Sequence, residues 1–69
     1  MKLKTLLDQI SGNNKINLKN WKTNERDKEF MNHLRFEYLT EEELNAPVLI
    51  LEGVGYNEIY ISIFEKEDQ

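Results

Sequence analysis

The run of Thr40, Glu41, Glu42 and Glu43 is the part of the sequence that looks most like a site. Neighbouring carboxylates take part in acid–base chemistry when burial and pairing shift their pKa values. The same run also matches a capping box, in which the Thr40 hydroxyl accepts a hydrogen bond from the Glu43 amide and the Glu43 carboxylate accepts one from the Thr40 amide. The helix dipole favours acidic residues in the first turn. We therefore interpret the three glutamates as the start of a helix on a solvated turn, not as a catalytic group.

The other residues offer little catalytic or metal chemistry. His33 is the only histidine, and nothing in the sequence pairs it with a nucleophile, so we interpret it as a surface or half-buried residue and not as a catalytic base. The chain has no cysteine, and a structural zinc site therefore lacks its usual ligands. Gly53 and Gly55 are not accompanied by the third glycine and the Lys-Ser or Lys-Thr pair of phosphate-binding motifs. The HExxH motif and the spacing of a calcium loop are also missing. We predict a protein that is not an enzyme and has no cofactor and no metal.

The net charge of −4 conceals two halves of opposite sign. Residues 1–35 carry eight Lys and Arg against four Asp and Glu, a balance of +4. Residues 36–69 carry one Lys against nine Asp and Glu, a balance of −8. Such asymmetry indicates a nucleic-acid contact or an acidic interaction surface, or else two halves that pack together and neutralise each other. We favour the last explanation, because most charge runs form solvated faces.

Helical periodicity is clearest at the start of the chain. Leu3, Leu6, Leu7 and Ile10 follow the i, i+3, i+4, i+7 spacing of one face of an amphipathic helix, and Gly12 is a natural C-terminal stop. A second, short helix is expected to begin at the capping box. It ends before the single proline of the chain, because proline disfavours the helical conformation of the residue that precedes it.

Three segments have the pattern of strands. Residues 15–21 alternate apolar and polar side chains, residues 48–51 form a short apolar run, and residues 58–64 alternate again. Gly53 and Gly55 lie between the last two segments and supply turn conformations. These two segments are therefore predicted to form a β-hairpin.

The middle of the chain, residues 22–38, has no single clear pattern. We expect a polar loop or short helical stretch to about Leu34, followed by a short strand in which Phe36 and Tyr38 lie on one face. The alternative is a helix that begins at Glu25 and places the apolar residues of this stretch on one side.

The elements together predict a single small α+β domain that covers residues 1–69. An N-terminal helix and a short acidic helix pack on a small, mostly antiparallel sheet of three or four strands that ends in a β-hairpin. A chain of this length has marginal stability, because it buries only about 60% of its unfolded surface. The predicted core consists of Leu3, Leu6, Leu7, Ile10, Ile16, Leu18, Leu44, Val48, Ile50, Ile59, Ile61 and Ile63.

The order of these elements resembles a group of small phage proteins. The stretch MKLKTLLDQISGNNKINL, a polar middle and then TEEELNAPVLILEGVGYNEIYISI resemble small uncharacterised proteins from phages and prophages of Gram-positive bacteria. The resemblance is one of pattern, and it implies a fold and an origin without assigning functional residues. It also implies a class of function, because phage genomes encode many short acidic proteins that bind and inhibit host defence enzymes. The residues that carry it are Leu3, Leu6, Leu7, Ile10, Gly12, Ile16, Leu44, Val48, Ile50, Ile59, Ile61 and Ile63.

The expected function is therefore non-enzymatic binding to a host or phage protein in the cytoplasm. An acidic inhibitor of a nucleic-acid-binding or defence protein of the host fits the −8 half, because carboxylates can imitate the phosphates of nucleic acids and attract a basic groove. No stretch is apolar enough for a signal peptide or a membrane span. The candidate partner-binding residues are Trp21, Glu37, Glu41, Glu42, Glu52 and Glu58.

Two alternatives stay open. Lys15, Lys19, Trp21 and Lys22 lie close together in the basic half, where lysines could contact phosphates while the indole stacks on a base. The acidic charge of the whole domain argues against this nucleic-acid-binding function. The second alternative is a structural homo-oligomer, such as a homodimer, that forms through a free sheet edge.

Overall fold

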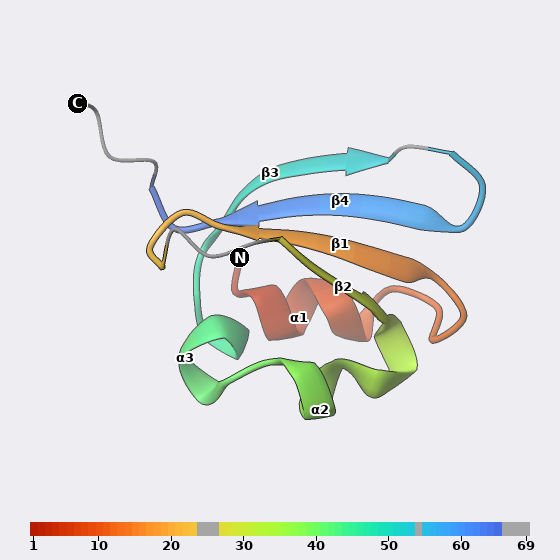
Figure 1. The fold of residues 1–69 in the computed structure, drawn as a ribbon, viewed down its shortest axis with the longest axis horizontal. Helices are drawn as coiled ribbons and strands as arrows, with labels where there is room; N and C mark the ends of the chain where they lie inside the picture. The colour runs from red at the N-terminus through yellow and green to blue at the C-terminus, as the bar shows by residue number, and fades with distance from the viewer. Residues whose placement is uncertain (24–26, 54, 66–69) are drawn as a thin grey trace.

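The computed structural model describes residues 1–23, 27–53 and 55–65, and Figure 1 shows its strands together with the short helices beside them. The elements in chain order are α1 (Leu3–Asp8), β1 (Lys15–Asn20), β2 (Lys28–Met31), the 3₁₀ helix η1 (Asn32–Leu34), α2 (Arg35–Tyr38), α3 (Glu41–Leu44), β3 (Val48–Gly53) and β4 (Glu58–Ile63).

The four strands form one mixed sheet in the order β2-β1-β4-β3. β1 pairs antiparallel with β2 and parallel with β4, while β3 and β4 form an antiparallel hairpin. This arrangement confirms the predicted α+β fold with its mostly antiparallel sheet and C-terminal hairpin. In Figure 1 the helices lie nearest to β1 and β2, and β3 is the strand farthest from them. The face of the sheet that points away from the helices is called the open face below.

The core lies between the helices and the inner face of β1, β2 and β4. Seven predicted core residues are buried, and four more are partly buried against them: Leu3, Leu6, Leu7, Ile16, Leu18, Ile61 and Ile63 in the first group, and Ile10, Leu44, Val48 and Ile59 in the second. The prediction is wrong for Ile50, which is 48% exposed. The register explains this, because Ile50 lies opposite Ser62 on the open face, whereas its neighbour Leu51 lies opposite the buried Ile61.

Sequence analysis missed three core residues, namely Phe30, Leu39 and Ala46. Phe30 is the central apolar residue of β2, where it lies opposite Ile16 of β1 and is buried. The strand thus lies at the centre of the middle segment, at residues 28–31, and not at its end.

The predicted strand around Phe36 and Tyr38 is wrong, because these residues belong to the helix α2 and both are exposed. The alternation of apolar and polar residues over 35–38 therefore does not correspond to a strand with one buried face. The Tyr38 ring instead stacks on Phe30, with 5.7 Å between ring centroids. The alternative of a continuous helix from Glu25 is also wrong over residues 28–31, which form β2, while Glu25 itself lies outside the described residues.

Candidate protein-interaction surface

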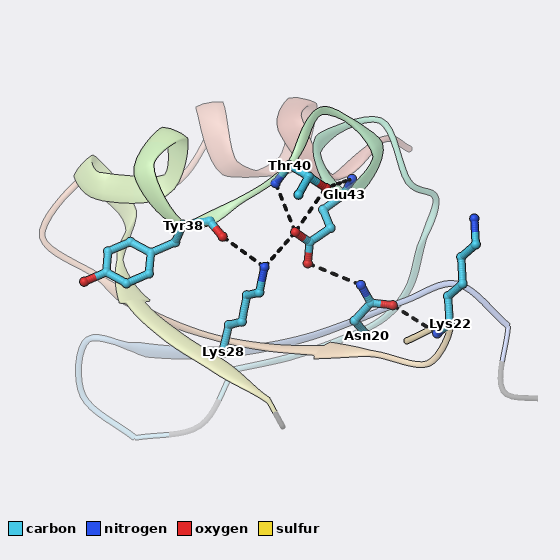
Figure 2. A network of polar contacts seen from close by, with 6 residues as sticks. All are labelled: Asn20, Lys22, Lys28, Tyr38, Thr40 and Glu43. Atoms are coloured by element: carbon cyan, nitrogen blue, oxygen red, sulfur yellow. Dashed lines mark hydrogen bonds and ion pairs between the residues drawn. The ribbon is translucent and has the colours of Figure 1, made fainter. Parts of the chain in front are cut away.

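The acidic run 40–43 starts α3, as predicted, and one of its glutamates has a second role. Thr40 and Glu43 form the capping box, with the Glu43 amide donating to the Thr40 hydroxyl at 3.2 Å and the Thr40 amide donating to Glu43 Oε1 at 3.0 Å. Glu43 is only 4% exposed, and Figure 2 shows its carboxylate pointing from the helix toward two strands. Lys28 Nζ of β2 lies 2.8 Å from Oε1, and Asn20 Nδ2 of β1 donates to Oε2 at 3.2 Å.

These donors determine the ionisation of Glu43. Burial alone would raise its pKa, but the hydrogen bonds from Lys28, the Thr40 amide and Asn20 outweigh burial and hold the pKa below its ordinary value of 4.5. These partners, Lys28, Thr40 and Asn20, all belong to the fold itself. Glu43 is therefore a structural anion that links α3 to the sheet, and the expectation that all three glutamates are solvated is wrong for this residue.

The other acidic candidates on the helical side of the molecule are exposed. Glu41 and Glu42 lie in the first turn of α3, and Glu37 lies on α2. Glu42 forms an ion pair with Lys22, whose ammonium also lies 5.2 Å from the centre of the Phe64 ring. Lys22 thus extends toward α3.

The open face carries a row of polar residues that crosses all four strands. The register places Glu29 of β2 opposite Asn17 of β1, Asn17 opposite Tyr60 of β4, and Tyr60 opposite Glu52 of β3. Residues opposite each other in neighbouring strands share a face and lie within side-chain contact distance. The row therefore places Glu52 from the acidic half on the same face as Asn17 from the basic half, with Tyr60 between them.

Lys15 occupies the next position on this face and contacts two carboxylates, one from each neighbouring strand. Lys15 Nζ lies 3.4 Å from Glu29 and 3.5 Å from Glu58. The hydrogen bond and the charge of Glu29, assisted by Glu58, raise the pKa of Lys15 above its ordinary value. Glu58 is thus a candidate residue whose charge is already paired.

A hollow of about 330 Å³ lies on the open face beside this row. Its walls include Asn17, Lys19, Trp21, Glu52, Tyr60 and Ser62. The Lys19 ammonium lies 4.6 Å from the centre of the Trp21 ring, a cation–π contact. Asn17 is 7% exposed, and its buried Nδ2 donates no hydrogen bond to any of the described residues.

The structure therefore separates the six candidate residues. Trp21 and Glu52 meet at the hollow, and Glu58 lies on the same face beside Lys15. Glu37, Glu41 and Glu42 belong to the helices that cover the other face. The basic candidates are separated too, because Lys19 contacts Trp21 on the open face while Lys22 pairs with α3.

Ion pairs also join the basic half to the acidic half, namely Lys15–Glu58, Lys22–Glu42 and Lys28–Glu43. Some of the opposite charges of the two halves therefore neutralise each other within the fold. Glu67 and Asp68, which contribute to the −8 half, lie outside the described residues.

Strand β3 is the surface that sequence analysis missed. It is the last strand of the sheet, and Leu49, Ile50 and Leu51 are 41%, 48% and 53% exposed. Ile50 points to the open face, whereas Leu51 points to the face that carries the helices. Because Leu51 is exposed even on that face, the helices do not cover β3 there. The signal in the sequence was the continuous apolar run 48–51, of which we assigned Val48 and Ile50 to the core.

Within residues 1–23, 27–53 and 55–65, no group of three His, Cys, Asp or Glu side chains is arranged to hold a metal ion. None of the helices in this part of the chain has the length and apolar character needed to cross a membrane. Comparison with protein-family models, with curated proteins and with solved structures finds no match.

Proposed function

We propose that this chain is a non-enzymatic protein-binding module that pairs its β3 edge with an extended segment of a partner protein. The observation that carries the proposal is the exposure of Leu49, Ile50 and Leu51 on a terminal strand. An edge strand presents unpaired backbone donors and acceptors, and proteins normally protect such edges with lysine, proline, bulges or a covering segment.

β3 has only part of this protection. Between Val48 and Ile50 the pairing with β4 shifts by one residue, as in a β-bulge. Val48 donates its amide to the Met1 carbonyl at 2.9 Å, and Lys2 forms a bridge with Pro47, so the N-terminal segment covers the start of the edge. Beyond this point β3 contains no lysine or proline. Addition of a strand at such an edge combines main-chain hydrogen bonds with burial of alternate side chains.

The negative charge of the open face favours a basic protein as the partner over a nucleic acid. Among the residues that the structure describes, the open face carries the lysines Lys15 and Lys19, and its carboxylates outnumber them: Asp27, Glu29, Glu52 and Glu58. A surface of this sign repels phosphates and speeds encounter with a basic protein, such as a nucleic-acid-binding protein of the host. The inhibitor function expected from the acidic half is compatible with this partner.

The test compares the wild-type chain with Leu51→Lys in selections from a displayed library of short peptides. Leu51→Lys places a charge on the edge, whereas Phe36→Lys makes the same kind of change at an exposed residue of α2 and serves as the matched control. We expect selected peptides to bind Leu51→Lys about tenfold or more weakly and Phe36→Lys as tightly as wild type. Bound peptide should also slow hydrogen exchange of amides between residues 49 and 53.

Two results would contradict the proposal. Peptides that bind both variants equally would show that β3 is not the binding edge. Light scattering that finds a stable wild-type dimer, converted to a monomer by Leu51→Lys but not by Phe36→Lys, would show that the edge is occupied by a second copy of the chain. That result would replace the partner protein with the homo-oligomer.

A further inference from the structure

Glu52 lies at the β3 end of the polar row on the open face, at the edge where a partner strand would pair. Its neighbour within the row is the uncharged Tyr60 of β4, and the Glu52 side chain is exposed. The two lysines described on this face are engaged elsewhere, because Lys15 pairs with carboxylates of its neighbouring strands and Lys19 lies over an aromatic ring. No described residue forms an ion pair with the Glu52 carboxylate. Its negative charge is therefore available to a partner at this edge.

The register of the hairpin determines which β3 side chains a paired strand would meet on each face. Ile50 lies opposite Ser62 and Glu52 lies opposite Tyr60, so both point to the open face. Leu51 lies between them in the chain and points to the face that carries the helices. Residues opposite each other in neighbouring strands share a face and interact, so apolar side chains fit opposite Ile50 and Leu51 and a positive charge fits opposite Glu52.

We propose that the partner segment pairs antiparallel with β3 and carries a lysine or arginine opposite Glu52 and apolar residues opposite Leu51 and Ile50. Along its own direction the segment then reads basic, apolar, apolar. This inference rests on the proposed strand pairing at β3 and adds the order of side chains in the partner.

The antiparallel direction follows from the part of this edge that the chain itself covers. Lys2 and Pro47 form an antiparallel bridge at the start of the edge. A partner strand opposite residues 49–53 would therefore continue the line of residues 1–2 and run in the same direction. Antiparallel pairs are also slightly more stable per residue than parallel pairs.

Neither a second copy of β3 nor a nucleic acid supplies this pattern. Glu52 is the only charged residue of β3, so a second β3 would place an apolar side chain or another carboxylate opposite it. A nucleic acid presents phosphates, which the Glu52 carboxylate repels. A peptide with one basic residue beside apolar residues is the occupant that this edge favours.

Three peptides of five residues test the order of side chains. The probe, acetyl-threonyl-lysyl-valyl-valyl-threonine amide, places its lysine opposite Glu52 when its valines lie opposite Leu51 and Ile50. The reversed peptide, acetyl-threonyl-valyl-valyl-lysyl-threonine amide, has the same charge but places its lysine opposite Ile50, and the third peptide replaces the lysine of the probe with glutamate. Amide chemical shifts of the nitrogen-15-labelled chain measure binding of each. We expect the probe to bind about fivefold more tightly than the glutamate peptide and about threefold more tightly than the reversed peptide.

Two variants of equal net charge locate the effect at Glu52. Glu52→Lys should reverse the preference, so that the glutamate peptide binds more tightly than the probe. Glu37→Lys makes the same charge change at an exposed residue of α2 and should keep the wild-type preference. An amide spectrum that matches wild type away from the substituted residue establishes that each variant is folded.

Equal binding of the probe and the glutamate peptide by wild type would overturn the inference, as would equal effects of Glu52→Lys and Glu37→Lys. Tighter binding of the reversed peptide would assign parallel pairing and overturn the stated order. Each of these results leaves strand pairing at β3 in place if Leu51→Lys still weakens the probe. Absence of binding by all three peptides would instead contradict the pairing itself, so the two failures are distinguishable.

Discussion

Lys28 Nζ lies 2.8 Å from Glu43 Oε1, and this ion pair joins the edge strand β2 to the helix α3. The Glu43 side chain is almost fully buried, while that of Lys28 is about one-third exposed. The same ammonium donates to the Tyr38 carbonyl at 3.0 Å, so it also holds the end of α2 (Figure 2). One lysine of β2 thus holds the two helices that follow this strand in the chain, α2 and α3.

Removal of this lysine should destabilise the fold. Lys28→Met keeps the aliphatic stem but leaves the Glu43 carboxylate with neutral donors only, and we expect a loss of about 2 kcal/mol in the free energy of unfolding. Lys22→Met breaks the exposed ion pair with Glu42 of the same helix and is the control, with an expected change within about 0.5 kcal/mol. Urea denaturation measures both. Equal losses in the two variants would contradict the structural role of the buried pair.

The lowered pKa of Glu43 predicts a specific sensitivity to acid. A carboxyl whose pKa is lower in the folded than in the unfolded state contributes stability above the unfolded value, and this contribution is lost as the pH falls through the folded pKa. The contribution of Glu43 should therefore be fully present at neutral pH and disappear below its ordinary value of 4.5. Urea titrations of wild type and Glu43→Gln over this range should converge as the pH decreases. A constant difference between them would show that the ionisation of Glu43 does not matter.

Sequence reasoning identified α3 because a capping box is local, with Thr40 and Glu43 three residues apart. It could not identify the ion pair, because Lys28 lies in a strand whose existence depends on pairing with β1. The segment 28–31 is too short for its alternation to stand out, and Phe30 is its only buried apolar residue. Residues 28–31 form a strand because they pair with β1, and this pairing places Lys28 beside Glu43.

The same limit applies to the hollow. Trp21 and Glu52 were candidate residues, but nothing in their spacing places them together. The parallel pairing of β1 with β4 brings Asn17 opposite Tyr60, and such non-local pairing leaves no local signal in the sequence. Asn17 itself resembles an ordinary polar residue of a half-exposed strand, so the sequence gives no reason to select it.

Ile50 and Ile61 provide a direct test of the two faces of the hairpin. Both are isoleucines in neighbouring strands, but Ile61 is buried and Ile50 lies exposed on the open face. Ile61→Ala should lower the free energy of unfolding by about 2–4 kcal/mol, and Ile50→Ala should lower it by less than about 1 kcal/mol. Urea denaturation gives both values. Similar losses would indicate that β3 is covered in solution, as it would be in a homo-oligomer.

Asn32 should be indispensable for the end of α1. It is fully buried, and its Nδ2 donates to the Leu7 and Ile10 carbonyls, both at 2.8 Å. These carbonyls belong to the last turn of the helix and the residues after it, where intrahelical partners run out. Asn32→Asp replaces the donor with an acceptor and buries a charge, so we expect a loss of more than about 3 kcal/mol. Asn13→Asp, an exposed change of the same type in the following turn, should cost less than about 0.5 kcal/mol in the same urea assay.

Gly12 follows α1 at a place where the backbone of η1 passes closely. His33 donates its amide to the Gly12 carbonyl at 3.1 Å, and a Cβ added at Gly12 would lie 3.1 Å from the His33 Cβ. This separation is shorter than an ordinary carbon–carbon contact, so Gly12→Ala must displace η1, and we expect a loss of about 1 kcal/mol. His33→Gly removes the opposing Cβ, and in that background Gly12→Ala should cost little or nothing. A double-mutant cycle in urea measures this coupling. Additive losses would show that the close approach of these two segments is not what requires glycine at this position.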